Sequence, residues 1–448
     1  MSSKDSSINH VAFEISPLLL ASGTFGDKSG VYRYYYGLIK AYGEYLKRNK
    51  LNEKIILFSF NKDLIGHPLT RDISQLLTSD SYKIINKIPP NDDKTIYSIY
   101  IFQLFVKPFF RVINKIVPLK NLYSYFINNF YFKRYVKFIR SELKKNKIKI
   151  IYHSETSFYP LKDFKNVITI YDMTPIILPF FHREATKDLT QRKLNFTTRH
   201  CQGIVCISDA TKKDLLAHYP GNNNKKITIC YPGLDSAFDK KSYDLKLFGD
   251  LQLIPRQQVA ELKRKSYLLY YGTFEPRKNL NNLVESFVEL QKEKKIPSDF
   301  KLILMGGDGW GKVKKGVINY VKENFPNKEK NNIIVFDFLN DDYLITLIKN
   351  AYAFVYPSFY EGFGLPVLES MSLGTPVICS RSSSLPEVGG SSVLYIDPHN
   401  FYDIKEKIRY LIKHPEYANH LSIKGSKQSE KFRWNKSIPK LHFYFKDL

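Results

Sequence analysis

The chain has 448 residues, 43% hydrophobic and 25% charged, a composition that excludes a disordered or low-complexity protein. The chain is longer than a single hydrophobic core usually supports, so its length predicts two domains of roughly 200 residues each. A formal net charge of +25 predicts an acidic partner (a phosphate-rich substrate, an anionic membrane or a nucleic acid), although a genomic bias toward Lys codons would give the same charge.

Two features of the whole chain bear on where the protein works. Its four cysteines show no C-x-x-C spacing, which is typical of a protein in a reducing cytoplasm. The N-terminus lacks the basic-then-apolar pattern of a signal peptide, and no apolar run approaches the roughly 20 residues of a membrane-spanning helix. We therefore expect a cytoplasmic protein, soluble or peripheral on the inner face of the cell membrane.

Short apolar runs alternate with helical patterns along the chain. The first half has candidate strands at 10–16, 54–60, 149–154, 166–172 and 203–208. The second half has them at 266–272, 300–307, 332–338, 353–358, 375–380 and 392–397. Near-continuous hydrophobic strands, each followed by a helix, predict two doubly wound α/β domains joined through the polar stretch 233–265. In such sheets, ligands bind beyond the carboxyl ends of the strands.

A basic, aromatic-rich segment interrupts the first half. Residues 101–150 hold twelve Lys or Arg residues and one acid, Glu142, and aromatic residues are interleaved among them. Basic amphipathic segments of this kind can lie on anionic membranes. An ordinary amphipathic helix packed on the N-terminal sheet, or a nucleic-acid-binding segment, would show the same pattern.

The loop after the strand at 266–272 carries two adjacent cations. In "YYGTFEPRKNLNNLVESFVEL", Arg277 and Lys278 precede Asn279, which can cap a helix with apolar residues at the 3.6-residue period. Two cations at a helix start are unfavourable for the macrodipole unless an anion binds there. The stretch predicts a phosphate site, or else two solvated surface charges. The later "MGGDGW" includes Gly307 and permits close backbone approach of a ligand, but it is not a dinucleotide fingerprint.

The stretch "YEGFGLPVLES" places two acids around a glycine turn. Glu361 precedes the turn, and Glu369 lies about one turn into a helix that starts near Pro366 and ends at Gly374. Carboxylates accept hydrogen bonds, so the pair suits sugar hydroxyls. The alternative is that Glu369 only favours the helix dipole and Glu361 is solvated.

Several motifs resemble retaining glycosyltransferases of the GT-B fold, in particular the large glycosyltransferase family 4. The stretch "EGFGLPVLE" is similar to that family's E-x7-E signature, and "GTFEPRKN", "SSSLPEVGG" and "LYIDP" stand in the family's usual order. "SGVYRYYYGLI", "TIYDMTP", "CISDATKKDL" and "ICYPGLD" look like its N-terminal landmarks. The resemblance covers nearly the whole chain and implies two Rossmann-like domains facing across a cleft.

The same resemblance implies roles for matching positions. Glu369 would bind the donor's ribose, Glu361 the transferred sugar, and Arg277 and Lys278 the diphosphate leaving group, with base contacts from backbone near Asp337 and Phe338. The implied catalytic residues are Glu361, Lys278, Arg277 and Asp172. The implied substrate-binding residues are Gly30, Tyr171, Thr273, Gly307, Phe363, Gly364, Leu365 and Glu369.

Two positions depart from the family pattern. Tyr171 stands where many relatives have His, so it can still hydrogen-bond a sugar but cannot act as an imidazole. Thr273 stands where others have Arg, so diphosphate neutralisation falls more heavily on Arg277 and Lys278. The chain has no D-x-D motif, and we expect no metal and no cofactor.

The resemblance implies three parts. Residues 1–240 would bind the acceptor and carry the basic insert at about 101–147, 241–430 would bind the nucleotide sugar, and 431–448 would form a helix crossing back to the N-terminal domain. The expected activity is retaining, metal-independent transfer of a hexose, mannose favoured, from a nucleotide-diphosphate sugar, GDP-mannose favoured. The expected acceptor is a glycan or lipid-linked glycan of surface polysaccharide (O-antigen or capsule) assembly.

Other functions are compatible with the same residues. The enzyme could instead be a glucosyl-, N-acetylglucosaminyl- or rhamnosyltransferase acting on another acceptor, including a glycogen-type synthase, or it could be an inactive scaffold. An anionic membrane surface is a further expected partner. A nucleic-acid-binding protein would explain the charge, but no recognised nucleic-acid motif is present and we expect no nucleic acid.

Overall fold

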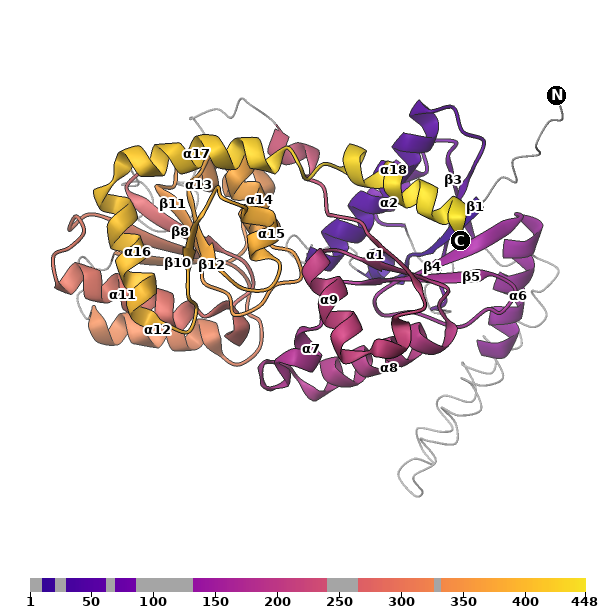
Figure 1. The fold of residues 1–448 in the computed structure, drawn as a ribbon, viewed down its shortest axis with the longest axis horizontal. Helices are drawn as coiled ribbons and strands as arrows, with labels where there is room; N and C mark the ends of the chain where they lie inside the picture. The colour runs from indigo at the N-terminus through magenta and orange to yellow at the C-terminus, as the bar shows by residue number, and fades with distance from the viewer. Residues whose placement is uncertain (1–9, 21–29, 62–68, 86–131, 240–264, 326–331) are drawn as a thin grey trace, which may run out of the picture.

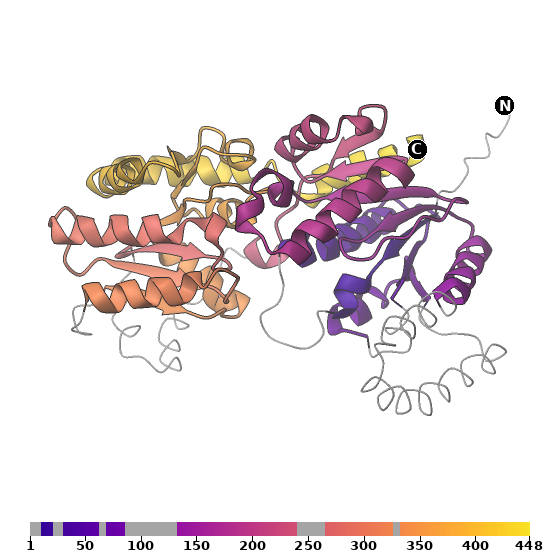
Figure 2. The same cartoon turned by 90° about the horizontal axis from the view of Figure 1, so that it is seen from below.

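The computed structural model describes residues 10–20, 30–61, 69–85, 132–239, 265–325 and 332–448. Two parallel sheets lie side by side, each with its own covering helices (Figure 1). Figure 2 shows helices on both faces of the C-terminal sheet. The two doubly wound α/β units predicted from the strand pattern are therefore confirmed.

The N-terminal sheet has the strand order β3-β2-β1-β4-β5-β6-β7, and all its pairs are parallel. Its strands are β1 (His10–Glu14), β2 (Ile55–Phe58), β3 (Tyr82–Ile85), β4 (Ile148–His153), β5 (Lys165–Ile170), β6 (Gly203–Cys206) and β7 (Lys226–Ile229). The two edge strands, β3 and β7, were not predicted from the sequence. Both are only partly buried, so their sequences lack the continuous apolar run of a central strand.

The C-terminal sheet has the order β10-β9-β8-β11-β12-β13. Its strands are β8 (Tyr267–Tyr271), β9 (Lys301–Met305), β10 (Ile333–Phe336), β11 (Ala353–Tyr356), β12 (Val377–Ser380) and β13 (Leu394–Ile396). Each falls inside a predicted run. The order reverses between β8 and β11, and this switch point is where doubly wound sheets bind ligands.

Helices connect the strands in both halves. Those of the N-terminal half are α1 (Ser16–Leu20), α2 (Gly30–Arg48), α3 (Arg71–Leu76), α6 (Phe132–Lys145), α7 (Thr174–Ile177), α8 (Glu184–His200) and α9 (Asp209–His218). Those that follow are α11 (Leu280–Lys292), α12 (Val313–Asn324), α13 (Asp341–Asn350), α14 (Leu365–Ser372), α15 (Leu385–Gly389), α16 (Phe401–Lys413), α17 (Pro415–Ser429) and α18 (Trp434–Asp447).

The last helix, α18, leaves the C-terminal half and packs on α2 (Figure 1). Trp434 lies against Gly37 and Gly233, where a Cβ would come within 2.9 Å and 2.4 Å of it. The Tyr42 hydroxyl and His442 Nδ1 share a hydrogen bond of 3.1 Å. These contacts place α18 against α2 and the segment after β7.

Only the end of the basic segment lies within the described residues. Helix α6 buries Tyr135, Val136, Ile139 and Leu143 in an apolar cluster with β1, β2 and β4, and it exposes its lysines and arginines. In this part the basic segment is an amphipathic helix packed on the sheet, while residues 101–131 lie outside the described part. No described helix is both long and apolar enough to cross a bilayer.

The two halves contact each other directly at the carboxyl edges of their sheets. The Ser208 hydroxyl donates to the Gly362 carbonyl at 2.7 Å. A Cβ at Gly362 would lie 2.2 Å from the Tyr171 carbonyl oxygen, so a larger residue would push the halves apart. The loop that holds Glu361 is therefore pressed against the segment after β5.

Candidate active site

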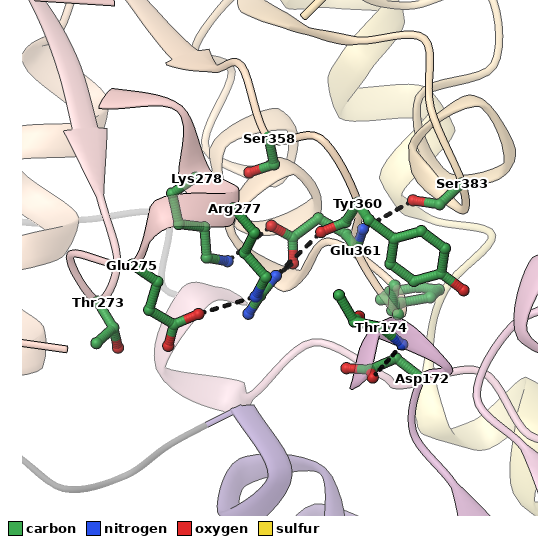
Figure 3. Close-up of polar contacts among 12 residues, drawn as sticks. Asp172, Thr174, Thr273, Glu275, Arg277, Lys278, Ser358, Tyr360, Glu361 and Ser383 are labelled. Atoms are coloured by element: carbon green, nitrogen blue, oxygen red, sulfur yellow. Dashed lines mark hydrogen bonds and ion pairs between the residues drawn. The ribbon is translucent and has the colours of Figure 1, made fainter. Parts of the chain in front are cut away.

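An ionic cluster joins three of the predicted residues. Lys278 Nζ lies 2.7 Å from Glu361 Oε1, and an Arg277 guanidinium nitrogen lies 3.0 Å from Glu361 Oε2 (Figure 3). All three side chains are at most 15% exposed. The cations follow β8 and the acid follows β11, the two strands at the switch point of the sheet. The structure thus brings the predicted phosphate loop and the first acid together.

Two residues that were not predicted from the sequence complete this cluster. Arg277 Nε lies 2.8 Å from Glu275 Oε2, and Lys278 donates to the Tyr356 hydroxyl at 2.6 Å. Glu275 stands within the quoted "GTFEPRKN", so its closeness in sequence to the two cations could have indicated its role. Tyr356 lies in a predicted strand and gave no such signal. With two acids facing two cations, the cluster is neutral overall when every group is charged.

Charge, rather than burial, decides the ionisation of Glu361. Burial alone raises the pKa of this carboxyl, but the charges of Arg277 and Lys278 outweigh burial and hold the pKa at about 2. Burial, followed by the charge of Arg277, lowers the pKa of Lys278 below its usual value. Glu361 therefore stays a carboxylate throughout the neutral range.

The backbone around the cations is a short 3-10 turn, Pro276–Lys278, followed by Asn279 at φ +59°. The prediction that the Asn279 side chain caps α11 is wrong. Asn279 is the N-cap residue by position, but its side-chain amide donates to the Pro398 carbonyl at 2.8 Å. The left-handed backbone of Asn279 turns its side chain away from the helix. A backbone hydrogen bond links this loop to the one before Glu361, because the Phe359 amide donates to the Arg277 carbonyl at 2.8 Å.

The second acid, Glu369, has a different partner. It is buried in α14, which begins after Gly364 at φ +105°. One carboxylate oxygen lies 2.5 Å from the Arg33 guanidinium of α2, and the other accepts from the Tyr271 hydroxyl at 2.8 Å. Burial raises the pKa of Glu369, and Arg33 only partly offsets this. Arg33 was not predicted as a site residue, although it lies in the quoted "SGVYRYYYGLI".

The segment after β5 faces the ionic cluster from the other half. Figure 3 shows Asp172 and Thr174 on the side of the N-terminal half that faces Tyr360 and Glu361. An oxygen of Asp172 accepts from the Thr174 amide at 3.0 Å. Tyr171 is turned into the protein, with its ring edge-on to Tyr34 at 5.5 Å. Of the two residues predicted in the segment after β5, Asp172 therefore faces the ionic cluster and Tyr171 does not.

The remaining predicted residues are spread around this centre. The Phe363 ring is 3% exposed and packs on Tyr231 and Phe432, so only its backbone could meet a ligand. A Cβ on Gly307 would lie 2.9 Å from the ring of Phe338. Gly30 is the exposed first residue of α2. Thr273 lies at the edge of the group of residues drawn in Figure 3. Leu365 lines a cavity of ≈ 20 Å³ together with Arg33 and Trp434.

Two family models match the chain. The model described as Glycosyl transferases group 1 matches residues 254–428, and that of Glycosyltransferase Family 4 matches residues 101–238. The O-antigen chain mannosyltransferase B of Escherichia coli is 30% identical over 286 residues, which are 63% of this chain and 71% of that protein. The chain belongs to the family 4 glycosyltransferases.

Two further similarities fit this glycosyltransferase. The serotype-specific mannosyltransferase WbdA of Escherichia coli is 29% identical over 194 residues, which are 40% of this chain but only 22% of that longer protein. The crystal structure of a glycosyltransferase from Rickettsia africae superposes with a TM-score of 0.62 at 17% identity, covering 98% of both chains. The fold is therefore GT-B, as expected from the motifs, and the protein is a glycosyltransferase.

The arrangement suits a reaction that builds negative charge on a leaving group. Fixed cations in a buried site stabilise such charge without reorganising at the moment of reaction. Arg277 and Lys278 are two buried cations of this kind, and each forms an ion pair with Glu361 while Arg277 also pairs with Glu275. Among the described residues, no group of His, Cys, Asp and Glu has the arrangement of a metal site.

Proposed function

We propose that this glycosyltransferase transfers mannose from GDP-mannose to a saccharide acceptor, with retention of anomeric configuration. Arg277 and Lys278 neutralise the diphosphate, Glu361 orients both cations and contacts the transferred sugar, and Glu369 binds the ribose. Asp172 faces the reacting centre from the acceptor side. The observation that carries the proposal is the buried pairing of both cations with Glu361 at the switch point of the donor-side sheet.

The choice of mannose is supported by the relatives named as O-antigen and serotype-specific mannosyltransferases. The test is release of nucleoside diphosphate from a panel of GDP-mannose, UDP-glucose, UDP-N-acetylglucosamine and dTDP-rhamnose, with a mannose-containing saccharide as acceptor. We expect turnover with GDP-mannose above all others. Turnover confined to a UDP- or dTDP-sugar would contradict the mannose assignment and favour the glucosyl-, N-acetylglucosaminyl- or rhamnosyltransferase alternative.

Metal independence and retention form a separate part of the proposal. The two fixed cations supply the positive charge that a D-x-D-bound metal supplies in other glycosyltransferases, and the chain has no such motif. We expect full activity in EDTA. We also expect NMR of the product to show the transferred sugar with the same anomeric configuration as in the donor. Loss of turnover in EDTA with recovery on adding Mn²⁺ or Mg²⁺ would contradict metal independence.

We also propose a cytoplasmic protein that associates with an anionic membrane and glycosylates a lipid-linked acceptor of surface polysaccharide assembly. The exposed Lys133, Arg134, Lys137 and Arg140 of α6 support this. Because α6 buries its apolar face in the protein, its attraction would be electrostatic and would weaken with salt. Replacing all four by Glu should abolish binding to vesicles containing phosphatidylglycerol. Unchanged binding by the variant would contradict a role for α6.

A further inference from the structure

His182 brings an imidazole to the junction between the two halves. It follows the 3-10 turn Pro179–Phe181 and precedes α8 in the N-terminal half. Its ring centroid lies 5.4 Å from that of Trp310, which belongs to the loop after β9. The Trp310 indole donates to the Phe181 carbonyl, and the Phe181 ring stacks on Phe359 at 5.4 Å. The other half therefore holds this segment in a defined position.

Both nitrogens of His182 are buried, and neither has a hydrogen-bond partner among the described residues. The hydroxyl of Thr174, two residues after Asp172, is likewise buried and without a partner in that part of the chain. Buried polar groups are nearly always hydrogen-bonded in folded proteins, so these two exceptions in the segment after β5 need an explanation. A ligand with hydroxyl groups would satisfy them.

The charges around His182 come from both halves. Burial lowers the pKa of its imidazole, as do Arg277 and Lys187, while Asp172 and Glu275 act in the opposite direction. The imidazole is therefore neutral near pH 7 and offers one donor and one acceptor. This pair matches a sugar hydroxyl, which both donates and accepts, better than it matches a phosphate.

We infer that His182 and Thr174 position the saccharide acceptor by hydrogen-bonding its hydroxyl groups beside Asp172. The inference rests on the proposed function, in which Asp172 faces the acceptor. Both residues belong to the N-terminal half, and the donor cations belong to the other. Trp310 packs on the imidazole from the C-terminal half.

The experiment compares His182→Phe, His182→Gln and Thr174→Val. Phe keeps the ring packing on Trp310 but removes both nitrogens, Gln keeps a donor and an acceptor, and Val keeps the shape of Thr. The control is His420→Phe, which changes an exposed histidine of α17 that also stacks on an aromatic ring. Each variant is assayed for acceptor KM, donor Kd and hydrolysis of the donor by water.

We expect His182→Phe to raise the acceptor KM roughly tenfold or more, as loss of one to two hydrogen bonds predicts. Donor Kd and donor hydrolysis should stay within about twofold, and His182→Gln should retain most of the acceptor affinity. In the wild type, kcat/KM for acceptor should fall as acid protonates the imidazole, and this fall should be absent in His182→Gln.

An unchanged acceptor KM in His182→Phe, or a loss of donor binding in parallel, would overturn the inference. Saturation-transfer NMR of mannose-containing saccharides on wild type and His182→Phe gives a readout that needs no turnover. If the wild type binds saccharide through His182 but transfers no sugar from any donor, the proposed function fails and the inference survives. If it transfers mannose while all His182 variants bind saccharide equally, only the inference fails.

Discussion

The surroundings of Glu361 and Glu369 differ in one respect that matters for function. Glu361 faces two cations from its own half of the molecule, whereas Glu369 faces Arg33, which belongs to the other half. Burial raises the pKa of both, yet the pKa of Glu361 is held at about 2 while that of Glu369 is raised. The first site is complete within one half. The second depends on contact between the halves.

A third buried acid extends the comparison. Glu14, at the end of β1, is fully buried and accepts hydrogen bonds from Ser16, Ser154 and the Phe60 amide. Burial raises its pKa to about 7, because these hydrogen bonds offset only part of the desolvation cost. The series from Glu361 through Glu369 to Glu14 shows that the number of facing cations, more than burial, sets the charge of each acid.

The largest expected effect comes from removing a cation of the first site. Lys278→Ala leaves Glu361 with Arg277 alone and removes a charge aimed at the leaving group. A buried charge contact is worth about 2–5 kcal/mol, so turnover should fall roughly thirtyfold to several-thousandfold. Steady-state kinetics with the preferred sugar nucleotide measure this.

A matched control for that variant is Lys405→Ala. Lys405 also faces two acids, Glu289 and Glu293, but on α16 away from the cluster. It should lower stability slightly and leave turnover unchanged. Equal losses of activity in the two variants would show that Lys278 acts only through folding.

The third acid gives a pH-dependent stability. Since the folded pKa of Glu14 lies above its unfolded value, its contribution to stability falls as pH rises from about 4.5 to 7. Glu14→Gln should remove this dependence, so the wild type should lose about 2–3 kcal/mol relative to the variant between pH 5 and pH 8. Urea unfolding at the two pH values measures the difference. If the free energy of unfolding changes equally between the two pH values in Glu14→Gln and in the exposed control Glu416→Gln, the pKa of Glu14 is not raised.

The smallest expected effect comes from the contact between the halves. Arg33→Met keeps the side-chain length but removes the charge facing Glu369. If Arg33 holds this carboxylate in place for the ribose, donor KM should rise roughly tenfold, about 1.4 kcal/mol, with a smaller change in kcat. Arg48→Met, on the exposed last turn of α2, serves as the control. A fall in kcat alone would argue against a role in donor binding.

The features that could be predicted from the sequence are those that depend on a local residue pattern, namely the central strands and the loops that follow them. Central strands such as β8 and β11 have continuous apolar runs, and the loops after them supplied Arg277, Lys278 and Glu361. The ion pairing of these residues was not predicted, and it arises where the parallel strands β8 and β11 end at one edge of the sheet. Partners that come from distant elements could not be predicted: Arg33 of α2 pairs with Glu369 of α14 across the two halves, and His182 has no motif of its own.

The central claim is that the cluster of Arg277, Lys278 and Glu361 and the separate acid Glu369 hold opposite ends of one nucleotide sugar. A crystal structure of the protein with bound GDP tests this most directly. We predict the diphosphate within hydrogen-bond distance of Arg277 and Lys278, and the ribose hydroxyls on the Glu369 carboxylate. A diphosphate bound elsewhere, with both cations still engaged only with Glu361 and Glu275, would contradict the account.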